Sequence, residues 1–172
     1  MEAAIEVNAE EGYHIVPEIM IPLVGDKKEL ACVKKTVVET AEKVKAEMNS
    51  DIEYKVGTMI EIPRAALMAD EIAEEAQFFS FGTNDLTQYT LAVDRQNAKL
   101  DKFYDPYHPA LMALLAHIAK SANEAGIWAG ICGELGADPK MQEKFIEMGF
   151  TELSMAAGRI LESRKRVCES EV

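Results

Sequence analysis

The fold of this chain is indicated most directly by the stretch from Phe78 to Asp85, Phe-Phe-Ser-Phe-Gly-Thr-Asn-Asp. Its first half is almost continuously apolar, which is typical of a strand covered on both faces, as in a parallel sheet. Its second half consists of Gly, Thr, Asn and Asp, which suit a bend and the start of a helix. The stretch therefore predicts a strand that ends in polar side chains and leads into a helix.

Four more runs along the chain have the same character, being short, apolar and bounded by Gly, Pro, Asp or Asn. These runs are Glu18 to Val24, Val56 to Ile62, Trp128 to Cys132 and Glu152 to Ala156. Helical periodicity of apolar residues separates them. The expected helices cover 30–44, 67–76, 111–122, 138–149 and 160–167, with a further helix starting near Asp85. Strands that alternate with helices predict βαβ units and a parallel α/β sheet.

Five such units are too few to close an eight-stranded barrel. They fit either an open doubly wound sheet or part of a barrel, and composition does not choose between these. A dinucleotide-binding sheet is not supported, because no Gly-rich fingerprint follows any run. The 172 residues suffice for one domain, 1–172. Its first 12 residues are acidic and are expected to form an edge with little order, not a signal peptide.

Charge and cysteine content exclude several classes of function. The net charge of −12 argues against a surface for nucleic acid or anionic membrane, because phosphate binding needs a basic patch. No segment approaches the 18 apolar residues that mark a membrane span. Cys32, Cys132 and Cys168 are odd in number and far apart, which disfavours disulfides and zinc and favours a reducing cytoplasm.

Polar residues collect where three of the runs end. Glu61 stands at the end of one run, Thr83 to Asp85 follow the next, and Cys132 to Glu134 end another. Ligand sites of parallel α/β proteins form at the carboxyl ends of strands. These three groups are therefore expected to converge on one rim.

Glu61 and Asp85 are candidate ligands of a divalent ion. A carboxylate within an apolar run is costly unless it is paired, protonated or bound to a metal. The alternatives are a structural ion pair between Glu61 and Arg64 and a helix N-cap role for Asp85. Two carboxylates on neighbouring strands suit Mg2+, which takes one or two protein carboxylates plus substrate oxygens.

The remaining candidates are an anion-binding group and an acid. Thr83 and Asn84 offer donors at a strand-to-helix junction, although they also suit a simple bend. Arg95 can supply positive charge for a phosphate or carboxylate, or can form a surface pair with Asp94 or Asp101. Cys132 is by itself more typical of a small core residue, but its rim position also permits proton transfer. Glu134 could tune or relay that proton, or could simply be a solvated side chain.

Longer motifs resemble the phosphoenolpyruvate (PEP)-utilising enzymes. The stretches similar to the C-terminal PEP-binding domain of pyruvate phosphate dikinase are Pro17 to Val24, Gly57 to Leu67 and Phe78 to Gln88. Those more similar to enzyme I of the bacterial sugar phosphotransferase system are Thr87 to Arg95, Tyr104 to Pro106 and Cys132 to Leu135. PEP synthase is a third relative. The resemblance extends over nearly the whole chain from about Glu10.

This resemblance implies a (β/α)8 TIM barrel of the PEP/pyruvate type, of which this chain would form strands four to eight. Within it, Glu61 and Asp85 would match the Mg2+ ligands, and Cys132 would match the proton donor. Residues matching those that contact substrate would be Glu61, Gly82, Thr83, Asn84, Asp85 and Arg95.

The implied reaction is reversible phosphoryl transfer between PEP, with pyruvate as product, and a histidine on a mobile domain of the parent protein. A homodimer is also implied. Two phosphate-holding arginines of earlier strands and the phosphohistidine motif are missing, so we expect a part of a larger enzyme with little turnover by itself. The alternative from another class is a catalytically silent dimerisation module, because a half-barrel exposes unpaired strand edges.

Overall fold

The computed structural model describes residues 1–170, in which five parallel strands form one sheet. The strands are β1 (Glu18–Ile21), β2 (Lys55–Ile60), β3 (Phe78–Gly82), β4 (Trp128–Cys132) and β5 (Glu152–Leu153). They lie side by side in the order in which they occur along the chain. A doubly wound sheet reverses its strand order part-way. The sequential order therefore favours part of a barrel.

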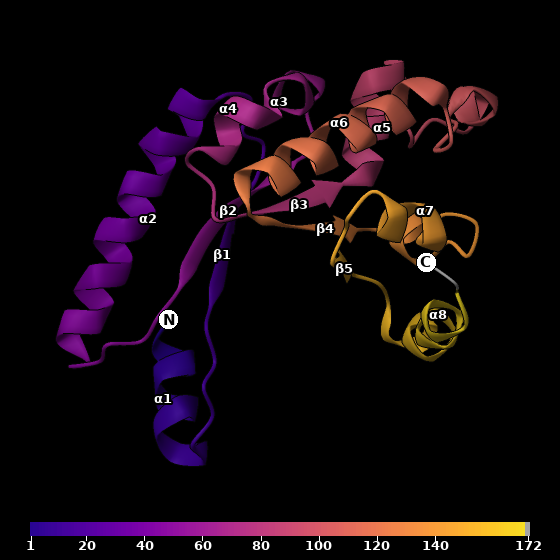
Figure 1. Ribbon diagram of the computed structural model, residues 1–172. Coiled ribbons are helices and arrows are strands. Elements are labelled where there is room, and N and C mark those ends of the chain that lie inside the picture. The colour runs from indigo at the N-terminus through magenta and orange to yellow at the C-terminus, as the bar shows by residue number, and fades with distance from the viewer. Residues whose placement is uncertain (171–172) are drawn as a thin grey trace.

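Helices connect the strands, and α2, α4 and α6 lie along one side of the sheet (Figure 1). The α-helices are α1 (Glu2–Glu11), α2 (Lys27–Glu47), α3 (Pro63–Leu67), α4 (Ala69–Ala73), α5 (Thr83–Leu91), α6 (Pro109–Ala125), α7 (Gln142–Glu147) and α8 (Ala157–Glu169). Two 3-10 helices are η1 (Ala98–Phe103) and η2 (Glu134–Ala137). None of the helices that residues 1–170 form is long and apolar enough to cross a membrane.

The sheet is strongly curved, as contacts across its other face indicate. Trp128 of β4 stacks on Phe78 of β3, with ring centroids 4.8 Å apart, and its Nε1 donates a hydrogen bond of 3.2 Å to Glu18 Oε1 of β1. In a flat sheet, strands three places apart are separated by about 14 Å. Side chains of β1 and β4 can meet over β2 and β3 because the sheet curls toward this face, as a barrel wall does.

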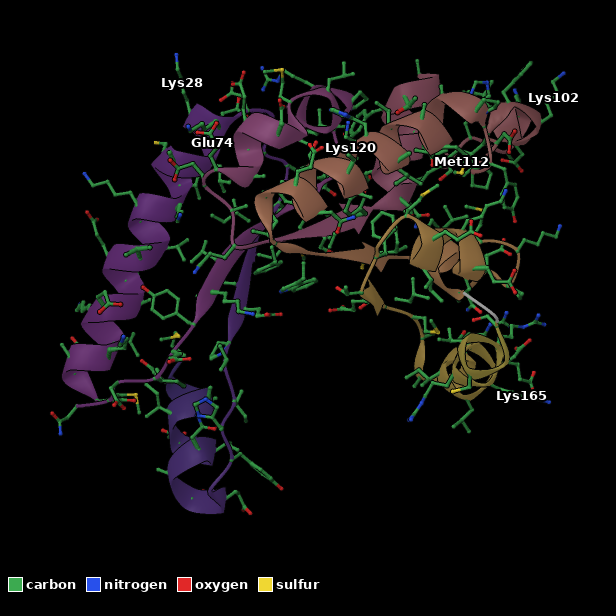
Figure 2. All side chains as sticks on the ribbon, viewed as in Figure 1. Lys28, Glu74, Lys102, Met112, Lys120 and Lys165 are labelled. Carbon is green, nitrogen blue, oxygen red and sulfur yellow. The ribbon has the colours of Figure 1, made fainter. Side chains whose placement is uncertain are left out.

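The core fills the space between the sheet and the helices. Phe79, Phe81 and Ile131 of the strands are fully buried, as are Leu115 and Ile118 of α6. The opposite sides of the helices are charged, and labelled side chains such as Lys28, Lys120 and Lys165 project away from the ribbon (Figure 2). Buried strands thus alternate with helices that bury one face and expose the other, as the pattern of apolar residues predicts.

Several element ends differ from the sequence-based expectation. The strand predicted to reach Val24 stops at Ile21, because Pro22 has no N–H to donate to the sheet. The helix predicted over 67–76 is split into α3 and α4 at Met68, which has φ −107° and ψ 24°. The helix predicted to start at residue 138 is α7, which begins at Gln142 after a turn.

The first residues form a helix, α1, which the sequence analysis did not predict. Gly12 ends α1 in the left-handed conformation, with φ 68°, and its N–H bonds the carbonyl of Asn8. Asn8 also exchanges two hydrogen bonds with the backbone of Ile15, at 2.8 and 3.1 Å. These bonds tie the helix to the chain that enters β1, where an edge of little order was expected.

Candidate active site

The carboxyl ends of β2, β3 and β4 bring the predicted polar groups onto one rim. Glu61 directly follows β2, Gly82 ends β3, and Cys132 ends β4. Gly82 and Cys132 are partners in the register of the two strands. A Cβ placed on Gly82 would lie 2.8 Å from both the Cβ and the Oε2 of Glu61. The missing side chain at position 82 therefore leaves the room that Glu61 occupies.

Glu61 is held by a backbone donor from the loop after β1. Its Oε1 accepts a hydrogen bond of 2.8 Å from the N–H of Leu23, and only 4% of the residue is exposed. Leu23 has a φ of 57°, a left-handed conformation that is costly for a leucine and that accompanies this bond. Burial raises the pKa of the Glu61 carboxyl. The hydrogen bond from the Leu23 N–H lowers this pKa, and the negative charge of Asp85 raises it further.

Asp85 is paired with Arg95. The Asp85 Oδ1 and Arg95 Nη1 atoms are 3.3 Å apart, and both side chains are about one-third exposed. Helix α5 starts at Thr83 with Gly82 as its N-cap residue, so Asp85 lies inside the first turn and is not the cap. Arg95 pairs with Asp85, not with the Asp94 or Asp101 considered from the sequence.

The ion pair considered for Glu61 and Arg64 does not form. Arg64 Nη2 lies 2.7 Å from Glu29 Oε1, and the Glu29 Oε2 accepts a 2.6 Å hydrogen bond from the N–H of Gly25. The charges that act on the Glu61 pKa are those of Asp85 and Arg95. Glu61 is thus a buried carboxylate, and the cation that acts on its pKa is Arg95, the partner of Asp85.

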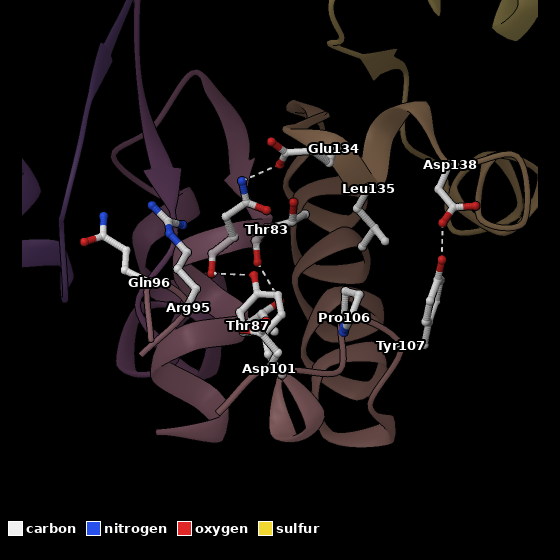
Figure 3. A pocket seen from close by; sticks show the side chains of 12 residues that line it. Thr83, Thr87, Arg95, Gln96, Asp101, Pro106, Tyr107, Glu134, Leu135 and Asp138 are labelled. Carbon is white, nitrogen blue, oxygen red and sulfur yellow. Dashed lines mark hydrogen bonds between the residues drawn. The ribbon is translucent and has the colours of Figure 1, made fainter. Parts of the chain in front are cut away.

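Thr83 and Asn84 join α5 to the turn after β4. Thr83 Oγ1 donates a 3.0 Å hydrogen bond to the carbonyl of Cys132. Figure 3 shows the second link, a 2.5 Å hydrogen bond that Asn84 Nδ2 donates to Glu134 Oε2. The hydrogen bond from Asn84 is the largest cause that lowers the pKa of Glu134. Glu134 is therefore an ionised hydrogen-bond acceptor at neutral pH.

Two cavities open on this rim. One, of about 630 Å3, is lined by Thr83, Asn84, Arg95 and Tyr104, among others (Figure 3). The other, of about 690 Å3, is lined by Cys132, Ser154 and Arg159, among others. The predicted anion-binding residues and the predicted acid thus face neighbouring spaces.

The donor set fits a hard divalent cation. Among residues 1–170, no group of three or more His, Cys, Asp or Glu side chains is placed to hold a metal. Mg2+ commonly takes one or two protein carboxylates and fills its remaining positions with water and substrate oxygens. Glu61 and Asp85 repel each other enough for Asp85 to raise the pKa of Glu61, and a bound cation would relieve that repulsion.

Sequence reasoning did not identify Leu23 and Tyr104. The Tyr104 hydroxyl donates a 3.3 Å hydrogen bond to the carbonyl of Asn84, and burial raises its pKa. Tyr104 lies in one of the motifs that carry the family resemblance, which was the available indication. Leu23 contributes only its backbone N–H, and nothing in a leucine side chain indicates such a role.

The chain as a whole is similar to known proteins of one family. Residues 2–172 match the family described as "PEP-utilising enzyme, PEP-binding domain". The chain is 50% identical over 177 residues to pyruvate, phosphate dikinase of Clostridium symbiosum, covering 93% of this chain. It is 44% identical over 149 residues to phosphoenolpyruvate-protein phosphotransferase of Streptococcus equinus, covering 85% of this chain. It spans 20% of the first protein's length and 26% of the second's.

Solved structures of low sequence identity share the fold. A malate synthase of Haloferax volcanii superposes with a TM-score of 0.66 at 18% identity, over 99% of this chain and 48% of that chain. A pyruvate kinase from Cryptosporidium parvum gives a TM-score of 0.63 at 11% identity, over 95% of this chain and 33% of that chain. These similarities confirm the prediction that the five strands are part of a TIM barrel.

Proposed function

This chain belongs to the PEP-utilising enzyme family, as its PEP-binding domain, and we propose that it forms the Mg2+- and PEP-binding part of a phosphotransferase of the pyruvate, phosphate dikinase type. The family membership predicted from the motifs is confirmed. The finer assignment rests on the 50% identity to the dikinase, and enzyme I and PEP synthase are the alternatives. The reaction proposed is phosphoryl transfer between PEP and a carrier histidine of the parent protein.

The convergence of Glu61 and Asp85 carries this proposal. One Glu61 oxygen is engaged by the Leu23 N–H, while Oε2 lies beside the bare Cα of Gly82. Asp85 is close enough to raise the pKa of Glu61 and is itself only partly exposed. A buried carboxylate and a second carboxylate close enough to act on its pKa suit the binding of a divalent cation.

The bound ion would neutralise charge that develops on phosphate and enolate oxygens. This chain's own residues would hold the substrate around it. Arg95 and the Asn84 amide would bind phosphate oxygens, because guanidinium and amide N–H groups are suitable donors. Thr83, in the first turn of α5, would present its backbone N–H to an anion. Gly82 would contribute through the absence of a side chain, which leaves room for the Glu61 carboxylate beside the substrate.

Cys132 would supply the proton in the second half of the reaction. When the phosphoryl group leaves PEP, the enolate of pyruvate remains, and its methylene carbon must take up a proton. Cys132 ends β4, beside Gly82 in the sheet, and lines its own cavity on the rim. A thiol in this position would donate its proton to carbon, and the thiolate would be reprotonated after product leaves.

The partners of the parent protein follow the same reasoning. PEP, pyruvate and the phosphohistidine domain are the expected partners, and a cytoplasmic location is expected for an enzyme with this substrate. The homodimer implied by the resemblance stays a prediction. Helix α8 exposes apolar side chains that an interface could cover, with 81% of Leu161 accessible to solvent.

The proposal is tested by the Mg2+-dependent binding of oxalate, whose two carboxylates copy the planar enolate of pyruvate. In Glu61→Gln, titration calorimetry should show that oxalate binding in the presence of Mg2+ is lost or weakened at least about tenfold, the equivalent of about 1.4 kcal/mol. Glu53→Gln, which removes an exposed carboxylate remote from the rim, should bind as the unmodified chain does. Undiminished oxalate affinity in Glu61→Gln would refute the proposal.

A further inference from the structure

Glu134 forms part of a clip that joins β3 and β4 at the rim. We define this clip by five residues: Thr83, Asn84, Cys132, Gly133 and Glu134. The hydrogen bonds from Thr83 Oγ1 to the Cys132 carbonyl and from Asn84 Nδ2 to Glu134 Oε2 link segments 49 and 50 residues apart in sequence. The two bonds run from the first turn of α5 to the last residue of β4 and to the turn that follows it.

The backbone of the clip depends on a glycine. Gly133 has a φ of 104°, which side chains rarely permit, and a Cβ there would lie 3.1 Å from Thr83 Oγ1. The turn after β4 can therefore approach α5 closely enough for Glu134 to reach the Asn84 amide. The turn that carries Cys132 and the helix turn that carries Asn84 thus have a fixed relative position.

Glu134 also stands between the two cavities of the rim. Glu134 and Asp138 are the residues that line both the cavity with Asn84 and Arg95 and the cavity with Cys132. Asp138 is engaged by the hydroxyl of Tyr107 (Figure 3). The carboxylate of Glu134 therefore separates the side expected to hold phosphate from the side expected to deliver a proton.

The charge of Glu134 determines how the Asn84 amide is turned. An ionised carboxylate has only acceptors, so it fixes Asn84 with the Nδ2 group toward Glu134. One of the two Nδ2 hydrogens is engaged by that bond, and the other stays available. Without Glu134 the amide could rotate by half a turn and present its oxygen, which repels a phosphate.

We propose that Glu134 is a positioning residue that sets the Asn84 amide for an anionic substrate and fixes the Cys132 turn relative to it. The proposal rests on the proposed function for the identity of the substrate. It does not make Glu134 a group that touches the reacting atoms. The effect of Glu134 is exerted through Asn84 on anion binding and should leave the two metal-binding carboxylates unaffected.

The test compares Glu134→Gln and Glu134→Ala with Glu143→Gln, which removes another exposed carboxylate, on α7. Titration calorimetry with Mn2+ alone and with Mn2+ plus oxalate separates metal binding from anion binding. We expect the oxalate dissociation constant to rise about tenfold in Glu134→Ala, the equivalent of about 1.4 kcal/mol, with the Mn2+ constant unchanged within about twofold. Glu143→Gln should change neither constant.

A nuclear magnetic resonance arm tests the clip independently of ligand binding. The side-chain amide signal of Asn84 in the 15N-labelled chain should shift with pH as Glu134 is protonated, and this shift should be absent in Glu134→Gln. Oxalate affinity within about twofold of the unmodified chain in both Glu134 variants would overturn the inference. An Asn84 signal that responds to pH equally with and without Glu134 would also overturn it. Failure of the unmodified chain to bind Mn2+ would instead count against the proposed function, leaving the Asn84 signal to decide the inference.

Discussion

Removing the positive charge of Arg95 should strengthen metal binding while it weakens substrate binding. Arg95 is the cation that lies beside Asp85, and its charge also acts on Glu61 and Glu134. The guanidinium therefore lies beside one of the two carboxylates that are proposed to hold a divalent ion. A metal bound by Glu61 and Asp85 would compete with this pair and be repelled by Arg95, until an anionic substrate lies between the two cations.

The size of the effect follows from the geometry of the pair. Opposite unit charges 3.3 Å apart attract by about 5 kcal/mol at an effective dielectric constant of 20 and by about 1 kcal/mol in water. The two side chains are 36% and 33% exposed, so solvent screening applies and the pair contributes about 0.5–1 kcal/mol. Release of Asp85 in Arg95→Gln should therefore lower the Mn2+ dissociation constant by about two- to fivefold.

Titration calorimetry with Mn2+ alone and then with oxalate measures both effects on one sample. Arg166→Gln is the matched control, because it removes the same charge on α8, where Arg166 pairs with Glu162. In Arg95→Gln we expect tighter Mn2+ binding and weaker oxalate binding, and in Arg166→Gln neither change. An unchanged or weaker Mn2+ affinity in Arg95→Gln would refute the idea that Arg95 and the metal compete.

Two further predictions concern Glu61. Gly82→Ala would place a Cβ 2.8 Å from Glu61 Oε2 and Met59 Sδ. We therefore expect urea unfolding to show a loss of about 1–3 kcal/mol in the free energy of unfolding, and titration to show weaker Mn2+ binding. An unchanged free energy of unfolding together with unchanged Mn2+ affinity would contradict the close packing. Burial raises the pKa of Glu61, so the folded chain binds a proton on this carboxyl more tightly than the unfolded chain does. The contribution of Glu61 to the free energy of unfolding therefore falls as the pH rises from the pKa of the unfolded state to that of the folded state. Urea unfolding of Glu61→Gln between about pH 4 and about pH 7 should lack that fall, and equal pH dependence of the two proteins would contradict the shift.

Much of the rim could be predicted because strand ends are visible in the sequence. Gly82 to Asp85 follow an apolar run so closely that a parallel sheet places them at the carboxyl edge. The partners of these side chains could not be predicted in the same way. From the sequence, the alternatives were that Asp85 caps a helix and that Arg95 pairs with Asp94 or Asp101. In the structure, Asp85 and Arg95 pair with each other. Such choices depend on the path of the loop after α5, which periodicity does not encode.

The sequence by itself determined the alternation of strands and helices, the family and the residue types on the rim, because these depend on local patterns and contiguous motifs. The tertiary structure decided the sequential strand order and the curl that lets Trp128 reach Glu18. It also decided that the Leu23 N–H holds Glu61 and that Glu134 holds Asn84. These contacts join residues 38 and 50 positions apart, so they exist only where the packed sheet brings different strand ends together.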